Sequence, residues 1–217
     1  MKSTLIALSI ALTLVSCGRR DEIIFEPVYV ASAPSSQDVD AQDLINEENA
    51  SRLAQGQTAL SSGLSCNLQT FTGGDRIQAS IADHNTLSGL TNVGSFLLAG
   101  GFNQEQSSVD VGMNVLPGSI KNVYKTMYLL RCTGYIVVTE NQYHSFELTS
   151  DDASVMYVDG AKVIDNDNAH ATTDKVAVKY LKRGVHSFRL DYAQNYGEQS
   201  LVLKMNEEVF TADMLAH

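Results

Sequence analysis

Several residue types are scarce in this chain of 217 residues, and the scarcity of basic residues argues against one class of partner. Tryptophan is absent, only 3 cysteines and 3 prolines occur, and 15 basic side chains face 25 acidic ones, so the formal charge is −10. An acidic surface repels phosphates, which argues against nucleic acid or anionic lipid as a partner. The hydrophobic fraction of 44% is typical of a globular domain.

The N-terminus has the pattern of an export signal. Met1-Lys2 precedes an apolar run from Leu5 to Val15, which is too short to span a membrane. The run ends in Ser16-Cys17, which resembles the lipobox of bacterial lipoproteins. Residues 1–16 are therefore predicted to be a signal peptide and Cys17 the lipidation site. The alternative is a plain secretory signal with a chance cysteine.

The lipobox resemblance also implies a location for the protein. Acyl chains on Cys17 would anchor the chain to a membrane. Gly18 follows, in place of the aspartate that retains many lipoproteins at the inner membrane. We therefore expect an exported lipoprotein anchored in the outer membrane.

Two cysteines remain, Cys66 and Cys132. In an oxidising compartment two remaining cysteines suggest one disulfide, and two buried free thiols are the alternative. Neither cysteine has a CxxC partner or a nearby histidine, so zinc and redox chemistry are not indicated.

Residues 17–63 are predicted to be a flexible acidic tether. The part from Gly18 to Asp43 is rich in Asp, Glu, Ser, Ala and Pro. Between Ala41 and Leu60 the apolar spacing supports only a marginal helix that starts near Asp40. We expect the folded domain to occupy residues 64–217.

The second half of the chain is dominated by strand patterns. Residues alternate in polarity from Tyr143 to Thr149, and the turn dipeptide Asp159-Gly160 lies between two apolar runs, which is a strong hairpin signal. A strand is expected to begin just after Cys132, next to Thr133-Gly134. Such closely spaced strands with little helical periodicity predict an all-β, antiparallel β-sandwich or barrel.

Asp151 and Asp152 form an acidic elbow at the end of one predicted strand. Neighbouring side chains on a regular strand point to opposite faces, so the two carboxylates can share an ion only if the backbone kinks between them. A cis peptide bond would provide that kink. Ordinary solvated turn residues are the alternative interpretation.

Longer residue strings resemble one known family. The strings RCTGYIVV, YHSFELTSDDASVMYVDGAKVIDNDNAH and VAVKYLKRGVHSFRLDYAQNYGEQSLVLKM are similar to the PA14 domain family, which is named after the anthrax protective antigen and shared by yeast flocculins and epithelial adhesins. The resemblance covers roughly Leu64 to Glu208. It implies a β-sandwich of jelly-roll or lectin-like kind.

The resemblance implies a calcium-dependent sugar site. In sugar-binding members of the family, two aspartates joined by a cis peptide hold one Ca²⁺, and a loop between the last two strands adds an asparagine and main-chain carbonyls. Asp151 and Asp152 match the aspartate pair. Asn195 matches the asparagine, and Gly197 and Gln199 are the candidates for the carbonyls. Calcium prefers such oxygen ligands.

In the absence of tryptophan, Tyr196 or Tyr192 is expected to stack on a sugar ring. The carbohydrate-binding residues are then predicted to be Asp151, Asp152, Asn195 and Tyr196. Asp159 is interpreted as a turn residue, residues 165–168 as a solvated loop, and His170 as a packing and hydrogen-bonding residue.

No catalytic motif occurs in the sequence. A G-x-S-x-G elbow, an HExxH pair and a phosphate-binding glycine loop are all missing, so an enzyme is not expected. Two functions remain open: a lipid-anchored envelope protein with a calcium-dependent carbohydrate-binding (adhesion) domain, and a structural or protein-interaction module of the envelope without a sugar site.

Overall fold

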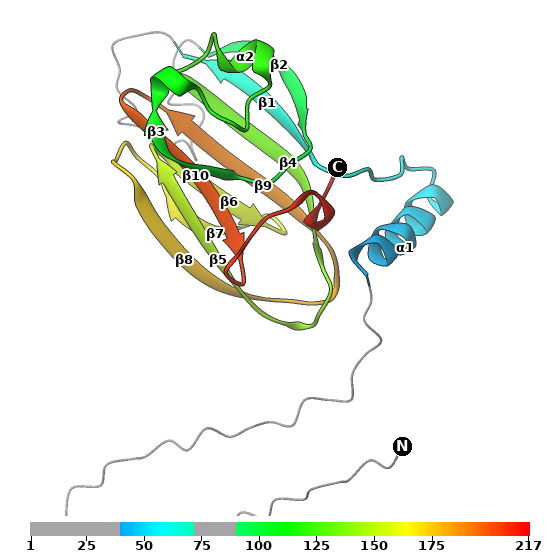
Figure 1. Cartoon of the computed structure of the whole chain (residues 1–217). Coiled ribbons are helices and arrows are strands. Elements are labelled where there is room, and N and C mark those ends of the chain that lie inside the picture. Colours follow the sequence, from blue (N-terminus) through cyan, green and yellow to red (C-terminus); the bar gives the residue numbers. More distant parts are fainter. Residues whose placement is uncertain (1–39, 72–89) are drawn as a thin grey trace, which may run out of the picture. The chain divides into compact units, whose positions relative to one another are not determined.

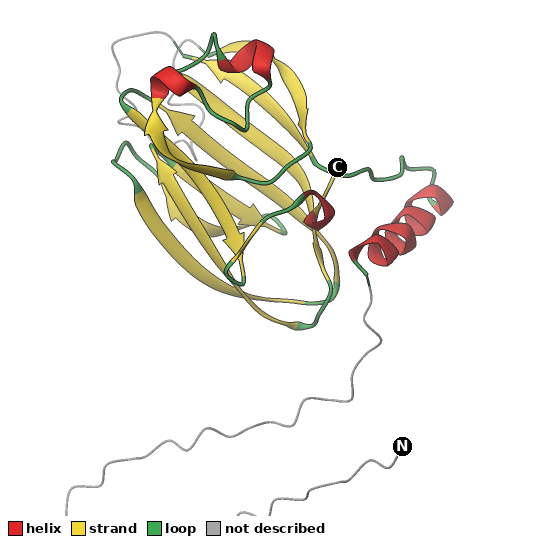
Figure 2. Ribbon diagram, in the orientation of Figure 1, coloured by secondary structure: helices red, strands yellow, loops and turns green. Residues whose placement is uncertain are grey.

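The strands form two antiparallel sheets that face each other (Figures 1 and 2). The protein is represented by a computed structural model that describes residues 40–71 and 90–217. The larger sheet contains, in spatial order, β2 (Thr91–Leu98), β1 (Leu64–Thr70), β4 (Tyr128–Val138), β9 (Gly184–Gln194), β6 (Ser154–Val158) and β7 (Ala161–Asn166). The short strand β12 (Leu215–Ala216) pairs with β4.

The smaller sheet contains β11 (Glu208–Val209), β10 (Glu198–Met205), β5 (Gln142–Asp151) and β8 (Thr173–Leu181), with β3 (Asn103–Ser108) beside β10. The described helices are α1 (Ala41–Ala54) and α2 (Gly118–Lys121), and two 3₁₀ turns span Val109–Val111 and Ala212–Met214. The antiparallel β-sandwich expected from the sequence is confirmed.

The core lies between the two sheets and follows the alternation of the strands. On β5, Phe146 and Leu148 are fully buried between the sheets, whereas Tyr143 on the opposite face is 72% exposed. The ring of Phe146 lies 6.5 Å from that of Phe210, which in turn lies 6.1 Å from Phe188 on the larger sheet. Burial of each such side chain stabilises the fold by about 1.5–3 kcal/mol.

The hairpin between β6 and β7 turns at the predicted dipeptide. Asp159 and Gly160 have φ angles of 53° and 73°, the left-handed values that a tight two-residue hairpin turn requires. The Asp159 carboxylate lies 2.8 Å from His186 Nδ1 and accepts a hydrogen bond from the Ser187 amide. Asp159 is therefore a turn residue, as predicted.

The Cys66–Cys132 disulfide is confirmed, and it joins β1 to β4 at residues that are directly paired. Cys132 lies in the interior of β4, which runs without a break from Tyr128 to Val138. The prediction that a strand begins just after Cys132 was therefore wrong. Gly134 does not end the strand. It leaves room for a neighbouring strand, because a Cβ atom there would lie 2.3 Å from the Ala216 carbonyl oxygen.

Gly134→Ala is expected to lower the free energy of unfolding by about 1–3 kcal/mol, because the new methyl group must displace the backbone of β12. It would also lie 2.7 Å from a methyl group of Leu64. Urea denaturation measures the change. Gly118→Ala is the matched control, since a Cβ atom there meets nothing within 4 Å. Equal stabilities of the two variants would contradict the prediction.

Helix α1 packs on the sandwich. Asp40 caps its N-terminus by accepting a hydrogen bond from the Gln42 amide. Leu44 and Ile45 are buried against Val137 and Ala216. These contacts place the helix, which the sequence assigned to the tether, on the outer face of the larger sheet. The described part of this folded unit begins at residue 40.

Two predictions concern residues outside the described part of the chain. The signal peptide and Cys17 both fall within residues 1–39, and residues 72–89 form the second undescribed range. Within residues 40–71 and 90–217, no helix has the length and apolar character needed to cross a membrane.

Candidate functional site

The acidic elbow lies where β5 ends and β6 is about to begin. Asp151 is the last residue of β5, Asp152 follows it, and the peptide bond between them is cis, as the family resemblance implied. Both aspartates are 6% exposed. They are therefore buried residues, and the interpretation as solvated turn residues was wrong.

Asn195 lies beside Asp152, although 43 residues separate them in the chain. The Asn195 backbone amide donates a 2.8 Å hydrogen bond to Asp152 Oδ2. Asn195 directly follows β9 and is 7% exposed. Its side-chain oxygen Oδ1 is buried without a hydrogen-bond partner in the described part of the chain. A buried acceptor of this kind is costly unless a water molecule, an ion or another ligand satisfies it.

Asp151 is held by three neighbours. The Thr172 hydroxyl donates to Asp151 Oδ2 over 3.2 Å. The Tyr192 hydroxyl lies 2.6 Å from the Asp151 carbonyl oxygen, and Ser200 pairs with Asp151 across β10 and β5. Tyr192 is fully buried, so the prediction of Tyr192 as a possible stacking residue was wrong. Tyr192 instead supports the elbow through its hydrogen bond to the Asp151 carbonyl oxygen.

Burial raises the pKa of both carboxyl groups. The pKa of Asp152 is raised to about 6, mainly by burial and further by the negative charge of Asp151, while the hydrogen bond from the Asn195 amide opposes the shift. Burial also raises the pKa of Asp151, and hydrogen bonds from Thr172 oppose it. Two buried negative charges that repel each other are stabilised when a cation binds between them.

The loop after Asn195 contains the other predicted residues. Tyr196 is 59% exposed, so its ring is free to contact a ligand. Gly197 has a φ angle of 94°, and its carbonyl oxygen accepts a 3.2 Å hydrogen bond from the Val109 amide. A carbonyl oxygen has two lone pairs, so this bond leaves one for another ligand.

Gln199 is a buried residue of β10. Its exposed fraction is 0%, and the side-chain atoms Oε1 and Nε2 both lack a hydrogen-bond partner in the described part of the chain. The sequence predicted a role only for its main-chain carbonyl. The orphaned side-chain amide is a feature that sequence reasoning missed, because a glutamine in a strand normally faces water.

These residues fit a calcium ion better than a transition metal. No group of three or more His, Cys, Asp or Glu side chains able to hold a metal occurs among the described residues. Calcium needs no such group, because it binds carboxylate, amide and carbonyl oxygens and completes its coordination with water or ligand hydroxyls. Asp151, Asp152 and Asn195 supply the first two kinds.

Sequence reasoning also missed a buried support on the β7 side of the elbow. Asn166, which was expected in a solvated loop, is 3% exposed and donates hydrogen bonds to the Ser150 hydroxyl and the Thr173 carbonyl oxygen. The Ser150 hydroxyl is in turn 2.7 Å from that of Ser154. His170 lies 2.9 Å from the Asn166 carbonyl oxygen, which agrees with its predicted hydrogen-bonding role.

Taken together, the fold and the site define a lectin-like β-sandwich with paired aspartates at one end. The model of the PA14 domain matches residues 87–208, which is more than half of the chain. The protein therefore belongs to the PA14 domain family. No curated protein matches the sequence.

Similar solved structures confirm the fold. The PA14 sugar-binding domain of an RTX adhesin is 17% identical with a TM-score of 0.57, over 72% of this chain and 98% of that one. The PA14 domain of the antifreeze protein MpAFP is 15% identical with a TM-score of 0.55, over 72% and 91%. The Epithelial Adhesin 9 A domain of Candida glabrata, in complex with Galβ1-3GlcNAc, is 14% identical with a TM-score of 0.53, over 72% and 88%.

Proposed function

We propose that this domain binds carbohydrate through a calcium ion held by Asp151, Asp152 and Asn195. The observation that carries the proposal is the buried Asn195 Oδ1 without a partner, next to two buried carboxylates with raised pKa values. One of the similar solved structures is named a sugar-binding domain and another contains a bound disaccharide, which supports the same function. Neither is named as an enzyme, and we propose a binding role without catalysis.

Each residue has a defined task in this function. Asp151 and Asp152 supply the negative charge, and Asn195 adds a neutral oxygen, with the carbonyls of Gly197 and Gln199 as further candidates. A bound calcium ion would offer its remaining coordination positions to neighbouring sugar hydroxyls. The exposed ring of Tyr196 is placed in the same loop and would stack on the sugar.

The biological setting that we propose is adhesion at the cell envelope. It rests on the Leu14-Val15-Ser16-Cys17 motif, which predicts a lipid-anchored protein exported to the outer membrane. The partner would be a carbohydrate or glycoconjugate. Radiolabelled palmitate should be incorporated by the producing cells into the wild-type protein and not into Cys17→Ser.

A calcium titration of the whole chain, followed by a glycan array with and without chelator, tests the binding function. We expect calcium binding in the micromolar to millimolar range typical of extracellular sites, and glycan binding that chelator abolishes. No calcium binding would overturn the proposal and leave a structural or protein-interaction module of the envelope. Calcium binding without any glycan would overturn the carbohydrate part alone.

Calcium affinity is expected to fall as the pH is lowered through about 6. Calcium binds the deprotonated carboxylates, and the pKa of Asp152 is about 6. Below that value each pH unit should weaken binding by about tenfold for this group, with a further loss where Asp151 protonates. Calorimetric titrations at pH 7.5 and 5.0 measure the effect. Equal affinities at the two values would contradict the raised pKa.

In the calcium-free protein the same shift has the opposite consequence for stability. A carboxyl group whose pKa is raised by folding contributes stability below its unfolded pKa, and this contribution is lost as the pH rises through the folded pKa. For Asp152 that interval runs from 3.8 to about 6. Because calcium also binds more weakly to the protonated carboxyl group, stabilisation by added calcium should be larger at pH 7.5 than at pH 5.0.

A further inference from the structure

The buried polar atoms without a partner gather at one place in the described chain. Five buried side-chain atoms lack a hydrogen-bond partner there, and four of them belong to Asn195, Gln199 and Ser200. Asn195 lies in the loop between β9 and β10, and the other two residues lie in the first part of β10. Such atoms are rare in folded proteins, and each calls for an ion, a water molecule or another ligand. The calcium ion proposed above satisfies one of them, Asn195 Oδ1, and leaves three.

Ser200 lies opposite the elbow. It pairs with Asp151 across β10 and β5, and the Cβ atoms of directly opposite residues are about 4.5–5.5 Å apart on the same face of the sheet. Val202 and Lys204, which share this face of β10, are partly exposed, whereas Ser200 is 0% exposed. Ser200 is therefore buried at the elbow end of a face that is partly open to solvent further along.

Gln199 and Ser200 differ in what satisfies them. Gln199 lacks a partner at both Oε1 and Nε2, and an amide nitrogen only donates hydrogen bonds, so a water molecule suits this side chain and a cation does not. The alternation of β10 also places Gln199 on the face of the buried Leu201 and Leu203, opposite to that of Ser200. The hydroxyl oxygen of Ser200 carries two lone pairs, so it is the orphaned atom on β10 that suits a cation.

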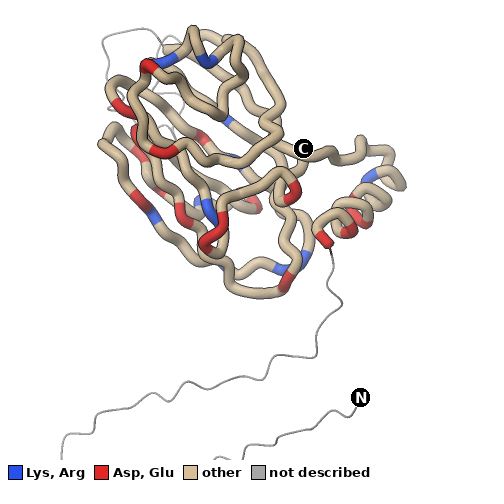
Figure 3. The backbone as a smooth tube through the Cα atoms, viewed as in Figure 1, with Lys and Arg blue, Asp and Glu red and all other residues tan. Residues whose placement is uncertain are grey.

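The charge around Ser200 favours a cation there. Asp151 is its direct neighbour on β5, Asp152 follows, and both carboxylates are 6% exposed. In the whole chain acidic residues outnumber basic ones by 25 to 15, and they are spread along both sheets and α1 (Figure 3). The field of such a protein attracts cations, and the two buried carboxylates concentrate that attraction at the elbow.

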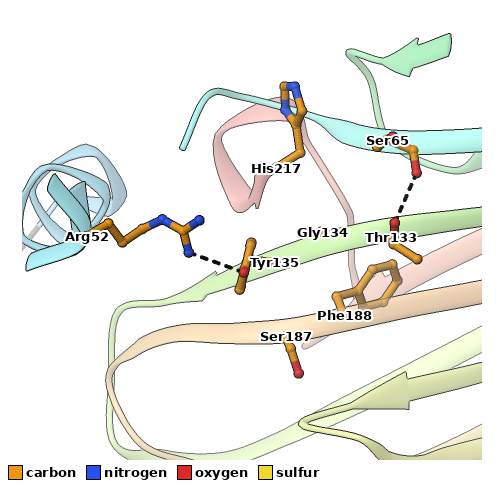
Figure 4. A pocket seen from close by; sticks show the side chains of 8 residues that line it. All are labelled: Arg52, Ser65, Thr133, Gly134, Tyr135, Ser187, Phe188 and His217. Carbon is orange, nitrogen blue, oxygen red and sulfur yellow. Dashed lines mark hydrogen bonds between the residues drawn. The ribbon is translucent and has the colours of Figure 1, made fainter. Parts of the chain in front are cut away.

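A hollow between α1 and the outer face of the larger sheet provides a contrast (Figure 4). Its charged side chain, Arg52, donates from Nε to the Thr58 carbonyl oxygen over 2.8 Å and from Nη1 to the Tyr135 hydroxyl over 3.3 Å. The guanidinium carbon also lies 5.5 Å from the centre of the Tyr135 ring. The protein itself supplies partners for this side chain, so the hollow does not call for a ligand. The elbow does, because its orphaned groups are buried.

We propose that the Ser200 hydroxyl oxygen is a further ligand of the calcium ion held at the elbow. This inference rests on the proposed calcium-binding function. Calcium takes about six to eight oxygen ligands, so the site accommodates another side-chain oxygen beside the two carboxylates and Asn195. The ion then connects the larger sheet, through the residue that follows β9, with both β5 and β10 of the smaller sheet.

Calorimetric titration of Ser200→Ala with calcium, in the whole chain, tests the proposal. We expect the affinity to fall about tenfold, as for the loss of one neutral ligand. Without calcium, urea denaturation should show Ser200→Ala to be at least as stable as the wild type, because the substitution removes a buried hydroxyl that has no partner. A structural hydroxyl would give the reverse, lower stability without calcium and unchanged affinity, and that result would overturn the proposal.

Thr149→Val is the matched control for the loss of a hydroxyl. Thr149 lies on the same face of β5, two residues before Asp151, and its hydroxyl already donates to Asp174 over 2.6 Å. This variant should keep the calcium affinity within about twofold of the wild type, because the hydroxyl already has its partner. An equal loss of affinity in Thr149→Val would show a general effect of this face, and it would overturn the assignment to Ser200.

A change of metal distinguishes a direct ligand from a residue that only holds a water molecule. Ser200→Cys replaces a hydroxyl by a thiol, which soft divalent ions prefer and calcium does not. In the Cys17→Ser background, where the disulfide occupies Cys66 and Cys132, we expect Ser200→Cys to bind Cd²⁺ at least tenfold more tightly than the parent. The complex should show an ultraviolet thiolate–Cd²⁺ absorption band that the parent lacks. Absence of both effects would overturn direct coordination.

Failure of this inference is distinguishable from failure of the proposed function. No calcium binding by the wild type would overturn both. Calcium binding by the wild type that Ser200→Ala retains in full would overturn the role of Ser200 alone, and it would leave the ion to the two aspartates and Asn195.

Discussion

Asp152→Asn is expected to weaken calcium binding by about 100-fold or more, because the number of charged ligands largely sets the affinity of such a site. The substitution preserves the shape of the side chain. An asparagine oxygen can still accept the hydrogen bond that the Asn195 amide donates to Asp152, so the loop is expected to stay in place. Calorimetric titration measures the loss.

The same variant should show a characteristic inversion of stability. Without calcium at pH 7.5, Asp152→Asn should be at least as stable as the wild type, because it removes a buried charge whose pKa is raised to about 6. With calcium at 100 times the dissociation constant, the wild type should gain about 2.7 kcal/mol that the variant does not.

Asp159→Asn is the matched control for this prediction. It carries the same chemical change, in a turn whose aspartate contacts His186 and Ser187 and not the elbow, and asparagine suits this turn. It should leave calcium affinity unchanged. An equal loss in both variants, or no loss in Asp152→Asn, would contradict the assignment of the ligand.

Removal of the disulfide has the largest expected effect on stability. The bond closes a loop with a sequence separation of 66 residues, and in the chain-entropy model such a loop stabilises the fold by about 4 kcal/mol. The double variant Cys66→Ala/Cys132→Ala is expected to lose about this amount in guanidinium denaturation. The melting temperature should fall by roughly 8–16 °C, at about 2–4 °C per kcal/mol for a domain of this size.

Reduction provides the control for the disulfide. The wild type in dithiothreitol should denature at the same midpoint as the double variant, and the double variant should not respond to reductant. Calcium affinity should stay unchanged, because Cys66 and Cys132 are buried in the core and outside the elbow. A loss below about 1 kcal/mol would contradict the chain-entropy value and show that residual structure already restricts the unfolded chain without the disulfide.

Much of the fold was predictable because strand patterns are local. The alternation from Tyr143 to Thr149 and the Asp159-Gly160 turn determine β5 and the β6–β7 hairpin through the two-residue period of a strand and the backbone preferences of a turn. The break predicted at Thr133-Gly134 failed for an equally physical reason. A glycine in a strand signals either an interruption or the close approach of another chain segment, and the sequence alone does not distinguish the two.

The candidate site was predictable only through the family pattern. Asp151 and Asp152 are adjacent in the chain, but nothing in the local sequence indicates that they are buried, because most aspartates in turns face water. Tyr192 and Asn166 show the same limit. Tyr192 was expected to stack on a ligand and Asn166 to lie in a solvated loop, but both are buried next to the elbow. Burial depends on the neighbours that the fold brings together.

The amino-acid sequence by itself determined β5, the β6–β7 hairpin turn and the acidic dipeptide, because each follows from local residue chemistry, and it left two cysteines as candidates for the disulfide. The tertiary structure alone decided which distant residues meet. It placed the Asn195 amide against Asp152, packed α1 on the larger sheet and brought Arg52 to Tyr135 across 83 residues. Such contacts depend on how two sheets and a helix pack, and a local pattern carries no information about that packing.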